Sequence, residues 1–327
     1  MKYLRSVLIA AFFLQSLPCF ALDLAKEPEI QAYINELVEK DNFDAGYLKQ
    51  LFSKAEINQE VLKQMTTAAT APMPWTDFRK IFITPKRVAQ GKEFWKKNRM
   101  ALASAQSQYG VPAEVIAGII GVETGYGINK GKFSTMDALT TLGFKYPSRA
   151  KYFKSELTSF LILCREQHWD PLTIKGSYAG ALGLPQFMPS SYRSYAVDYH
   201  RDGIKDLFFD EENVIASIGN YLQQKGWKVG QPVAIAAKKT SEKADKLVGS
   251  KPHYTLKQLA KNGIEPVAKT RGQPPVGVLN LQGNSGEEFW ITFTNFAVIK
   301  RYNSSNYYAL VVYELGNLVK PYPDKKA

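Results

Sequence analysis

The chain has 327 residues, which is enough for two or three packed units with a sizeable core. Its hydrophobic content of 45% and charged content of 22% are those of an ordinary globular protein. The formal net charge of +12 indicates an anionic partner, and composition leaves open nucleic acid, an acidic membrane, an acidic polymer, or a charged surface that only keeps the protein soluble.

The first 21 residues have the parts of a secretory signal peptide. Lys2 and Arg5 supply positive charge, residues 7–14 form an apolar run too short for a membrane span, and cleavage is predicted after Ala21. Lipidation at Cys19, which would make an outer-membrane lipoprotein, is the weaker alternative because a proline directly precedes this cysteine. We therefore expect a periplasmic protein. Export argues against nucleic acid as a partner and favours a cell-wall polymer.

Helical periodicity dominates the segment after the signal peptide. Apolar residues recur at helical intervals in 29–38, 47–52 and 61–65, which predicts three helices. Residues 86–109 predict one long amphipathic helix. We expect residues 22–95 to form an N-terminal helical domain.

A carboxylate then stands on an apolar helical face. Ile116, Ile119, Ile120 and Glu123 follow the spacing i, i+3, i+4 and i+7, so they share one side of a helix. Burial there raises the pKa of a carboxyl toward the range of a general acid. The alternative is a structural glutamate at a helix end, paired with a lysine or arginine.

A glycine-rich segment, residues 176–192, follows predicted helices at 134–142 and 150–168. Its glycines let the backbone pass close to a ligand, and the Gln186 amide can both donate and accept hydrogen bonds. This pattern favours a ligand groove. The alternative is a tight packing turn.

Acidic residues recur every four positions after this segment, with the spacing of a partial EF-hand calcium loop. They are Asp198, Asp202, Asp206 and Asp210, with Gly203 among them. The ligand set is degenerate, because His200 stands at loop position three and Phe209 replaces the glutamate of position twelve. The alternative is a polar loop in which Asp210 caps a helix over 211–225.

Composition shifts toward Lys, Gly and Pro after residue 228, with strand-like runs at 276–281 and 289–293. A helix is predicted again over 307–318. We expect a helical catalytic core at 96–227, a small β-containing domain at 228–295, and a C-terminal helical segment at 296–327 that packs on the N-terminal domain. The predicted fold class is mainly α, as an α+β protein.

Several short blocks of this sequence carry a resemblance to a known family. They are residues 82–85, 121–127, 147–153, 177–181, 186–192, 220–221 and 301–308. Together they resemble the lytic murein transglycosylase B family, glycoside hydrolase family 103 of the lysozyme-like superfamily, over nearly all of residues 25–318. The resemblance implies a lysozyme-like helical core, a surrounding α domain and a small β-containing insertion.

The resemblance also implies the site. Glu123 is then the single catalytic acid/base. The residues that match substrate-binding positions are Ser177, Gln186, Arg149, Tyr221, Tyr302 and Tyr308. Ser148 stands where a second arginine often precedes Arg149, which weakens the expected contacts to carboxylate groups. No cofactor or catalytic metal is expected, and only part of the ligand set at Asp198, Asp202 and Asp206 supports calcium.

The family reaction cleaves the β-1,4 bond between N-acetylmuramic acid and N-acetylglucosamine and leaves 1,6-anhydromuramyl ends. Ordinary glycosidases pair two carboxylates, whereas this sequence offers one plausible catalytic carboxylate. The alternatives are a hydrolytic muramidase and a non-catalytic peptidoglycan-binding protein. The expected partners are peptidoglycan glycan strands and, as a further class, other cell-wall enzymes, with the protein itself a monomer.

Overall fold

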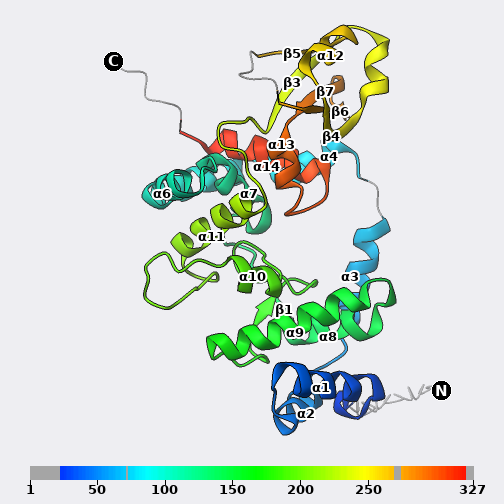
Figure 1. Cartoon of the computed structure of the whole chain (residues 1–327), viewed down its shortest axis with the longest axis vertical. Helices are drawn as coiled ribbons and strands as arrows, with labels where there is room; N and C mark the ends of the chain where they lie inside the picture. Colours follow the sequence, from blue (N-terminus) through cyan, green and yellow to red (C-terminus); the bar gives the residue numbers. More distant parts are fainter. Residues whose placement is uncertain (1–22, 71–72, 269–273, 322–327) are drawn as a thin grey trace, which may run out of the picture. The chain divides into compact units, whose positions relative to one another are not determined.

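The computed structural model describes residues 23–70, 73–268 and 274–321 (Figure 1). The predicted signal peptide, including Cys19, lies outside these residues. The chain divides into two compact units, one up to Glu56 and one from Ile57. The domain boundaries expected from the sequence remain predictions. Within the described ranges, no helix has both the length and the apolar character needed to cross a bilayer.

The first unit consists of η1 (Leu24–Lys26), α1 (Pro28–Asp41) and α2 (Ala45–Lys54). The Asp44 side chain begins α2 by accepting a hydrogen bond from the backbone N–H of Tyr47 at 2.6 Å. Tyr33 of α1 and Phe52 of α2 meet edge to face, with ring centroids 6.1 Å apart. The two helices predicted from the periodicity of this segment are confirmed.

The second unit is mainly helical. Its helical elements are α3 (Gln59–Thr70), α4 (Trp75–Phe82), α5 (Pro85–Lys97), α6 (Arg99–Tyr109), α7 (Ala113–Thr124), α8 (Thr135–Lys145), η2 (Pro147–Arg149), α9 (Ala150–Gln167), α10 (Pro189–Tyr195), α11 (Glu211–Gln224), η3 (Glu242–Leu247), α12 (Leu256–Lys261), α13 (Thr294–Ile299) and α14 (Asn306–Val319). The prediction of one helix over 86–109 is wrong, because the chain breaks at Asn98 between α5 and α6. The buried Asn98 amide donates to the Phe94 carbonyl at 3.0 Å and to Glu211 Oε2 at 2.5 Å, which ties the break to α11.

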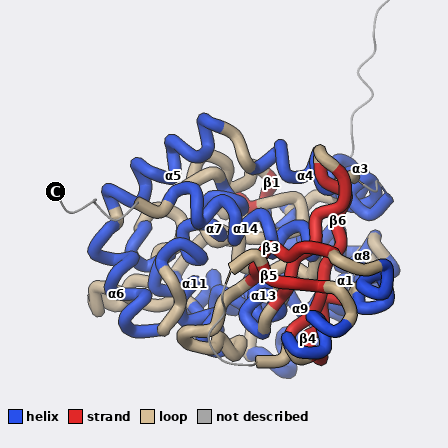
Figure 2. The backbone as a smooth tube through the Cα atoms, turned by 90° about the horizontal axis from the view of Figure 1, so that it is seen from above, coloured by secondary structure: helices blue, strands red, loops and turns tan. Residues whose placement is uncertain are grey.

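In the second unit, whose strands are drawn in red in Figure 2, β1 (Phe133–Ser134) and β2 (Lys175–Gly176) pair in a two-stranded sheet, and five further strands form a separate sheet. They are β3 (Ala234–Lys239), β4 (Gly249–Tyr254), β5 (Ile264–Pro266), β6 (Val276–Gly283) and β7 (Gly286–Thr292). The order is β4-β6-β7-β3-β5, all pairs being antiparallel. Both predicted strands, which correspond to β6 and β7, are confirmed. So is the mainly α fold class with a small β part.

Two glycines let α7 and α14 cross at close range (Figure 1). A Cβ on Gly118 would lie 2.2 Å from the Val312 carbonyl oxygen, and one on Gly316 would lie 2.1 Å from the Glu114 carbonyl oxygen. As the contact moves forward along α7 it moves backward along α14, so the helices run antiparallel. This register sets the end of α7 opposite the start of α14.

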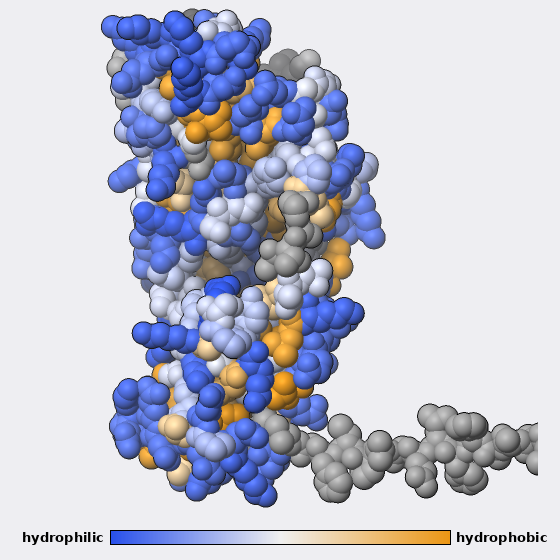
Figure 3. All heavy atoms as spheres, turned by 90° about the vertical axis from the view of Figure 1, so that its right-hand side faces the viewer, coloured by the Kyte–Doolittle hydropathy of each residue, from blue (hydrophilic) through white to orange (hydrophobic). Residues whose placement is uncertain are grey.

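Hydrophilic and apolar residues are distributed differently between the surface and the interior. On the face shown in Figure 3, hydrophilic residues dominate and apolar residues form separate patches between them. The apolar side chains of the sequence are instead concentrated inside the helical unit, where Ile116, Ile119 and Ile120 of α7 are fully buried. The helix that carries Glu123 is therefore enclosed along most of its length.

Candidate active site

Glu123 lies in the last turn of α7, which ends at Gly125 in the left-handed conformation (φ 58°). The residue is half-buried, and the Tyr308 hydroxyl donates a hydrogen bond to its Oε1 at 2.5 Å. Burial raises the pKa of Glu123 to about 7, and the hydrogen bond from Tyr308 opposes this rise because it stabilises the carboxylate. Near neutral pH the carboxyl is thus available both as an acid and as a base.

The structural alternative for this glutamate required a basic partner. Within the described ranges, no lysine or arginine forms an ion pair with Glu123, and burial and Tyr308 are the causes that set its pKa. No second carboxylate contributes to that shift either. The geometry is therefore that of an isolated acid group rather than of a helix-end salt bridge.

The three predicted tyrosines come together beside this carboxyl. Tyr302 and Tyr308 are nearly parallel, with ring centroids 6.4 Å apart, and Tyr221 meets Tyr302 at 4.9 Å. The Tyr221 hydroxyl donates to the Arg301 carbonyl at 2.6 Å, and the Tyr302 hydroxyl donates to the Pro185 carbonyl. Burial raises the pKa of Tyr221 to about 12 and raises those of Tyr302 and Tyr308 well above the ordinary value, so all three remain protonated donors.

The glycine-rich segment meets the end of α7. The Thr124 hydroxyl contacts the Leu184 carbonyl at 3.2 Å and binds this segment to the residue after Glu123. Gln186 has a left-handed backbone (φ 50°), and its Nε2 donates to the carbonyls of Gly183 at 2.8 Å and Lys130 at 3.3 Å. These bonds occupy the amide nitrogen and leave the Oε1 atom of Gln186 available.

Ser177 and Arg149 have different surroundings. The Ser177 oxygen accepts from the backbone N–H groups of Ala179 at 3.3 Å and Ala181 at 3.0 Å, so its own proton remains free to donate. Arg149 is exposed before the start of α9, with its guanidinium over the rings of Tyr152 (4.5 Å) and Phe153 (5.0 Å). No contact among the described residues joins Arg149 to Glu123 or its tyrosines.

Sequence reasoning missed two aromatic neighbours of this cluster. The ring of Phe187 lies 5.6 Å from that of Tyr221, and the ring of Tyr195 lies 4.9 Å from it. Phe187 directly follows Gln186 within one of the resemblance blocks, which is the signal that could have identified it. Tyr195 ends α10 and carries no comparable signal.

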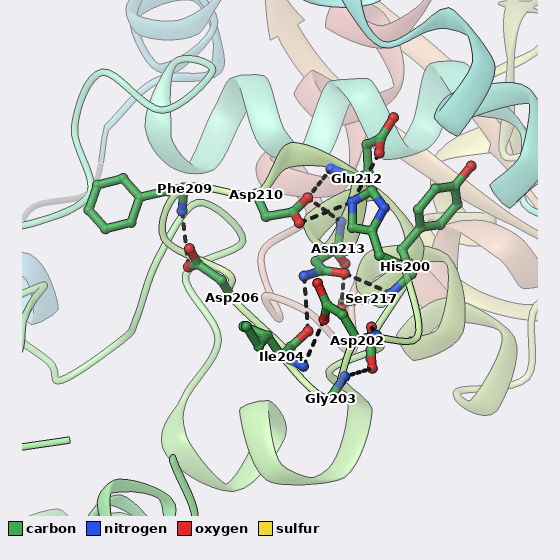
Figure 4. A network of polar contacts seen from close by, with 12 residues as sticks. His200, Asp202, Gly203, Ile204, Asp206, Phe209, Asp210, Glu212, Asn213 and Ser217 are labelled. Atoms are coloured by element: carbon green, nitrogen blue, oxygen red, sulfur yellow. Dashed lines mark hydrogen bonds and ion pairs between the residues drawn. The ribbon is translucent and has the colours of Figure 1, made fainter. Parts of the chain in front are cut away.

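The acidic loop uses its carboxylates on its own backbone (Figure 4). The Asp198 carboxylate accepts hydrogen bonds from the backbone N–H groups of Asp202 (3.2 Å) and Gly203 (2.7 Å). The Asp206 carboxylate accepts them from the backbone N–H groups of Phe208 (2.6 Å) and Phe209 (3.1 Å). The predicted cap is confirmed, since Asp210 accepts two N–H groups of the first turn of α11. In the part of the chain that the structure describes, no three Asp, Glu, His or Cys side chains gather as a metal site would require. The donor set does not fit calcium.

His200 takes a place in this loop that a ligand oxygen would otherwise fill. Its Nε2 lies 3.2 Å from Asp210 Oδ2 and 3.1 Å from Glu212 Oε2, which bridges the loop to the start of α11. In Figure 4 the Phe209 ring points away from the polar network, so position twelve of the loop offers no oxygen to its interior.

An apolar helix that ends on one carboxyl of raised pKa, inside a helical core, is the arrangement expected of a lysozyme-like protein. The profile of the transglycosylase SLT domain family matches residues 25–317. The chain belongs to this family.

Relatives with known names and structures agree over most of the chain. Membrane-bound lytic murein transglycosylase B of Escherichia coli is 41% identical over 306 residues, 91% of this chain and 84% of that protein. The structure of SltB1 from Pseudomonas aeruginosa aligns with a TM-score of 0.86 at 41% identity, covering 91% of this chain and 98% of that one. Slt35 of Escherichia coli in complex with bulgecin A aligns with a TM-score of 0.85 at 42% identity, covering 91% and 94%. Slt35 has also been solved in complex with calcium.

Proposed function

We propose that this protein is a peptidoglycan lytic transglycosylase that cleaves the β-1,4 bond between N-acetylmuramic acid and N-acetylglucosamine and forms 1,6-anhydromuramyl ends. The observation that carries the proposal is the isolated Glu123 carboxyl, whose pKa is raised to about 7. Family membership and relatives named lytic transglycosylases support it.

The reaction needs one group that gives a proton and then takes one. Neutral Glu123 donates its proton to the glycosidic oxygen as the bond from that oxygen to C1 of the muramyl unit breaks. The Glu123 carboxylate then removes the proton of the muramyl 6-hydroxyl, whose oxygen bonds to C1 and closes the anhydro ring. Glu123 ends protonated, as it began, and no water is consumed.

The remaining site residues act on this cycle through position and polarity. Tyr308 stabilises the carboxylate form of Glu123, which the second half of the cycle uses. The free Oε1 of Gln186 and the free hydroxyl proton of Ser177 are suited to the N-acetyl and hydroxyl groups of a sugar. The rings of Tyr221, which is buried, and Tyr302, which is half-buried, form an apolar wall, since their hydroxyls are bound to backbone carbonyls. Arg149, which is exposed, is assigned to the carboxylates of the substrate.

Digestion of purified sacculi tests the proposal. Wild-type protein should release muropeptides with anhydro ends, which weigh one water less than hydrolytic products, and Glu123→Gln should release none while keeping its fold. Hydrolytic products from the wild type would establish a muramidase. Binding of sacculi without release of fragments would establish a non-catalytic wall-binding protein.

We also propose that the protein works in the periplasm, as a monomer on glycan strands, and without calcium. The signal-peptide pattern and the name of the membrane-bound relative support export. The carboxylates of Asp198 and Asp206 accept hydrogen bonds from the backbone of their own loop, which supports activity without the metal. Fractionation of cells that produce wild-type protein or Cys19→Ala tests the location, because a lipoprotein would leave the membrane fraction only in the variant.

A further inference from the structure

A cavity of about 710 Å³ lies beside the acidic loop, outside the Glu123 cluster. Its walls come from the end of α9 and the residues after it, from the segment around Lys130, and from the loop at 203–209. The volume is in the range of cavities that take small ligands. No residue of the catalytic cycle proposed above lines it, and of the predicted site residues only Asp206 of the acidic loop does.

Aromatic rings form its walls. Trp169 meets Phe208 edge to face at 5.6 Å, and Phe209 beside them is 79% exposed. Ile204, another wall residue, is 58% exposed. Large apolar side chains held open to solvent in one cavity indicate a ligand with an apolar face, and the C–H face of a pyranose ring is such a surface.

The walls are held in place without a ligand. The Asp206 carboxylate, one of the candidate calcium ligands, accepts hydrogen bonds from the backbone N–H groups of Phe208 and Phe209. The Tyr192 hydroxyl donates to the Lys205 carbonyl and accepts from the N–H of Leu207 at 3.0 Å. The loop thus presents its aromatic residues in a preformed arrangement, which lowers the entropy cost of binding.

Two lysines, Lys130 and Lys175, line the cavity together with two acids, Glu166 and Asp206. Its acids are already engaged, since Glu166 forms a two-pronged ion pair with Arg193 and Asp206 binds backbone N–H groups. In the described part of the chain the exposed Lys175 ammonium has no anionic partner. The Lys130 ammonium lies 4.1 Å from the centre of the Phe209 ring and donates to the Phe208 carbonyl at 3.0 Å. Among these four side chains, the Lys175 ammonium is therefore the one available to a carboxylate of a ligand.

One short segment connects the cavity with the candidate active site. The Lys130 side chain is part of the cavity wall, while its carbonyl accepts the amide of Gln186. The next residue, Gly131, packs so closely that a Cβ there would lie 2.0 Å from the Gly176 carbonyl oxygen, directly before Ser177. The segment at Lys130 and Gly131 is therefore shared by the cavity wall and the candidate active site.

We propose that this cavity is an accessory subsite for a muramyl residue of the same glycan strand, with the sugar face on the aromatic wall and the lactyl carboxylate on Lys175. The inference rests on the proposed function for its ligand. In this proposal the acidic loop, whose donor set does not fit calcium, binds substrate instead.

The test uses the full-length Glu123→Gln protein labelled with 5-fluorotryptophan. The chain has five tryptophans, and Trp169→Phe assigns the fluorine signal of the cavity. A peptide-free tetrasaccharide of alternating N-acetylglucosamine and N-acetylmuramic acid should move the Trp169 signal. A tetramer of N-acetylglucosamine, which has no carboxylate, should move it with at least severalfold weaker affinity.

Matched variants separate the subsite from the fold. Phe209→Ala should weaken the tetrasaccharide response about three- to tenfold, the worth of an aromatic contact, whereas Met100→Ala, 69% exposed on α6, should not change it. Lys175→Ala should remove the preference for the muramyl tetramer, and the exposed Lys257→Ala on α12 should keep it. No movement of the Trp169 signal, or equal responses to both tetramers in the unsubstituted cavity, would overturn the proposal. Absence of anhydro products from wild-type digests would instead refute the proposed function. The digest tests the function and the fluorine signal tests the subsite, so the two proposals can fail independently.

Discussion

The raised pKa of Glu123 makes a quantitative prediction about stability. In the unfolded chain this carboxyl loses its proton near the ordinary value of 4.5, whereas in the folded protein it keeps the proton up to about 7. Between these values the folded state binds more protons than the unfolded state, so the free energy of unfolding falls as the pH rises. The difference between the two pKa values corresponds to about 3 kcal/mol, at about 1.4 kcal/mol per unit.

Glu123→Gln removes the ionisable group and should remove this loss. Relative to wild type, the variant should gain about 3 kcal/mol of stability between about pH 4 and about pH 8. For a unit of this size, about 2 °C in Tm accompanies each kcal/mol, so the Tm difference should grow by about 6 °C. Thermal unfolding of both proteins across this range measures the difference directly.

The pH dependence of the difference, rather than its absolute size, decides the outcome. Glu93→Gln, which alters an exposed carboxyl on α5, is the matched control and should show a Tm difference that changes little with pH. A Tm difference between Glu123→Gln and wild type that stays constant with pH would refute the burial argument. The same burial makes turnover fall above about pH 7, because the first step needs the neutral acid.

Four further outcomes follow from the contacts around the site. Tyr308→Phe removes a hydrogen bond that lowers the pKa of Glu123, so the alkaline limb of the pH–rate profile should move to higher pH, and a move to lower pH would contradict this. Gly118→Ala should destabilise by about 3 kcal/mol or more in thermal unfolding, because its methyl would meet a carbonyl at 2.2 Å, whereas Gly249→Ala, with open space around it, should change little. Gln186→Ala should lower turnover on sacculi at least tenfold and Tm by only a few degrees, since two neutral hydrogen bonds are worth about 1 kcal/mol each; a large Tm loss would favour the packing-turn alternative. Adding calcium or a chelator should leave Tm and anhydro-product formation unchanged, and a calcium-dependent rise in Tm would contradict the interpretation of the acidic loop.

Local patterns determined much of this protein from the sequence alone. A period of 3.6 residues reveals a helix because it depends only on which side of one element is apolar, and it placed Glu123 on the buried face of α7. The cap at Asp210 and the degenerate loop at His200 and Phe209 were equally local, since both depend on residues a few positions apart. The two strongest strands, β6 and β7, followed from composition in the same way.

Contacts between distant segments were decided by the tertiary structure. The break at Asn98 depends on Glu211 of another helix, so periodicity alone predicted one continuous helix. Tyr308 lies 185 positions from Glu123 and reaches it because glycines on α7 and α14 permit close approach in a single register. The pKa of Glu123 depends on that enclosure, since desolvation comes from every element packed around a group. The sequence therefore determined which carboxyl is on the apolar face, and only the packing of distant helices decided how strongly it holds its proton.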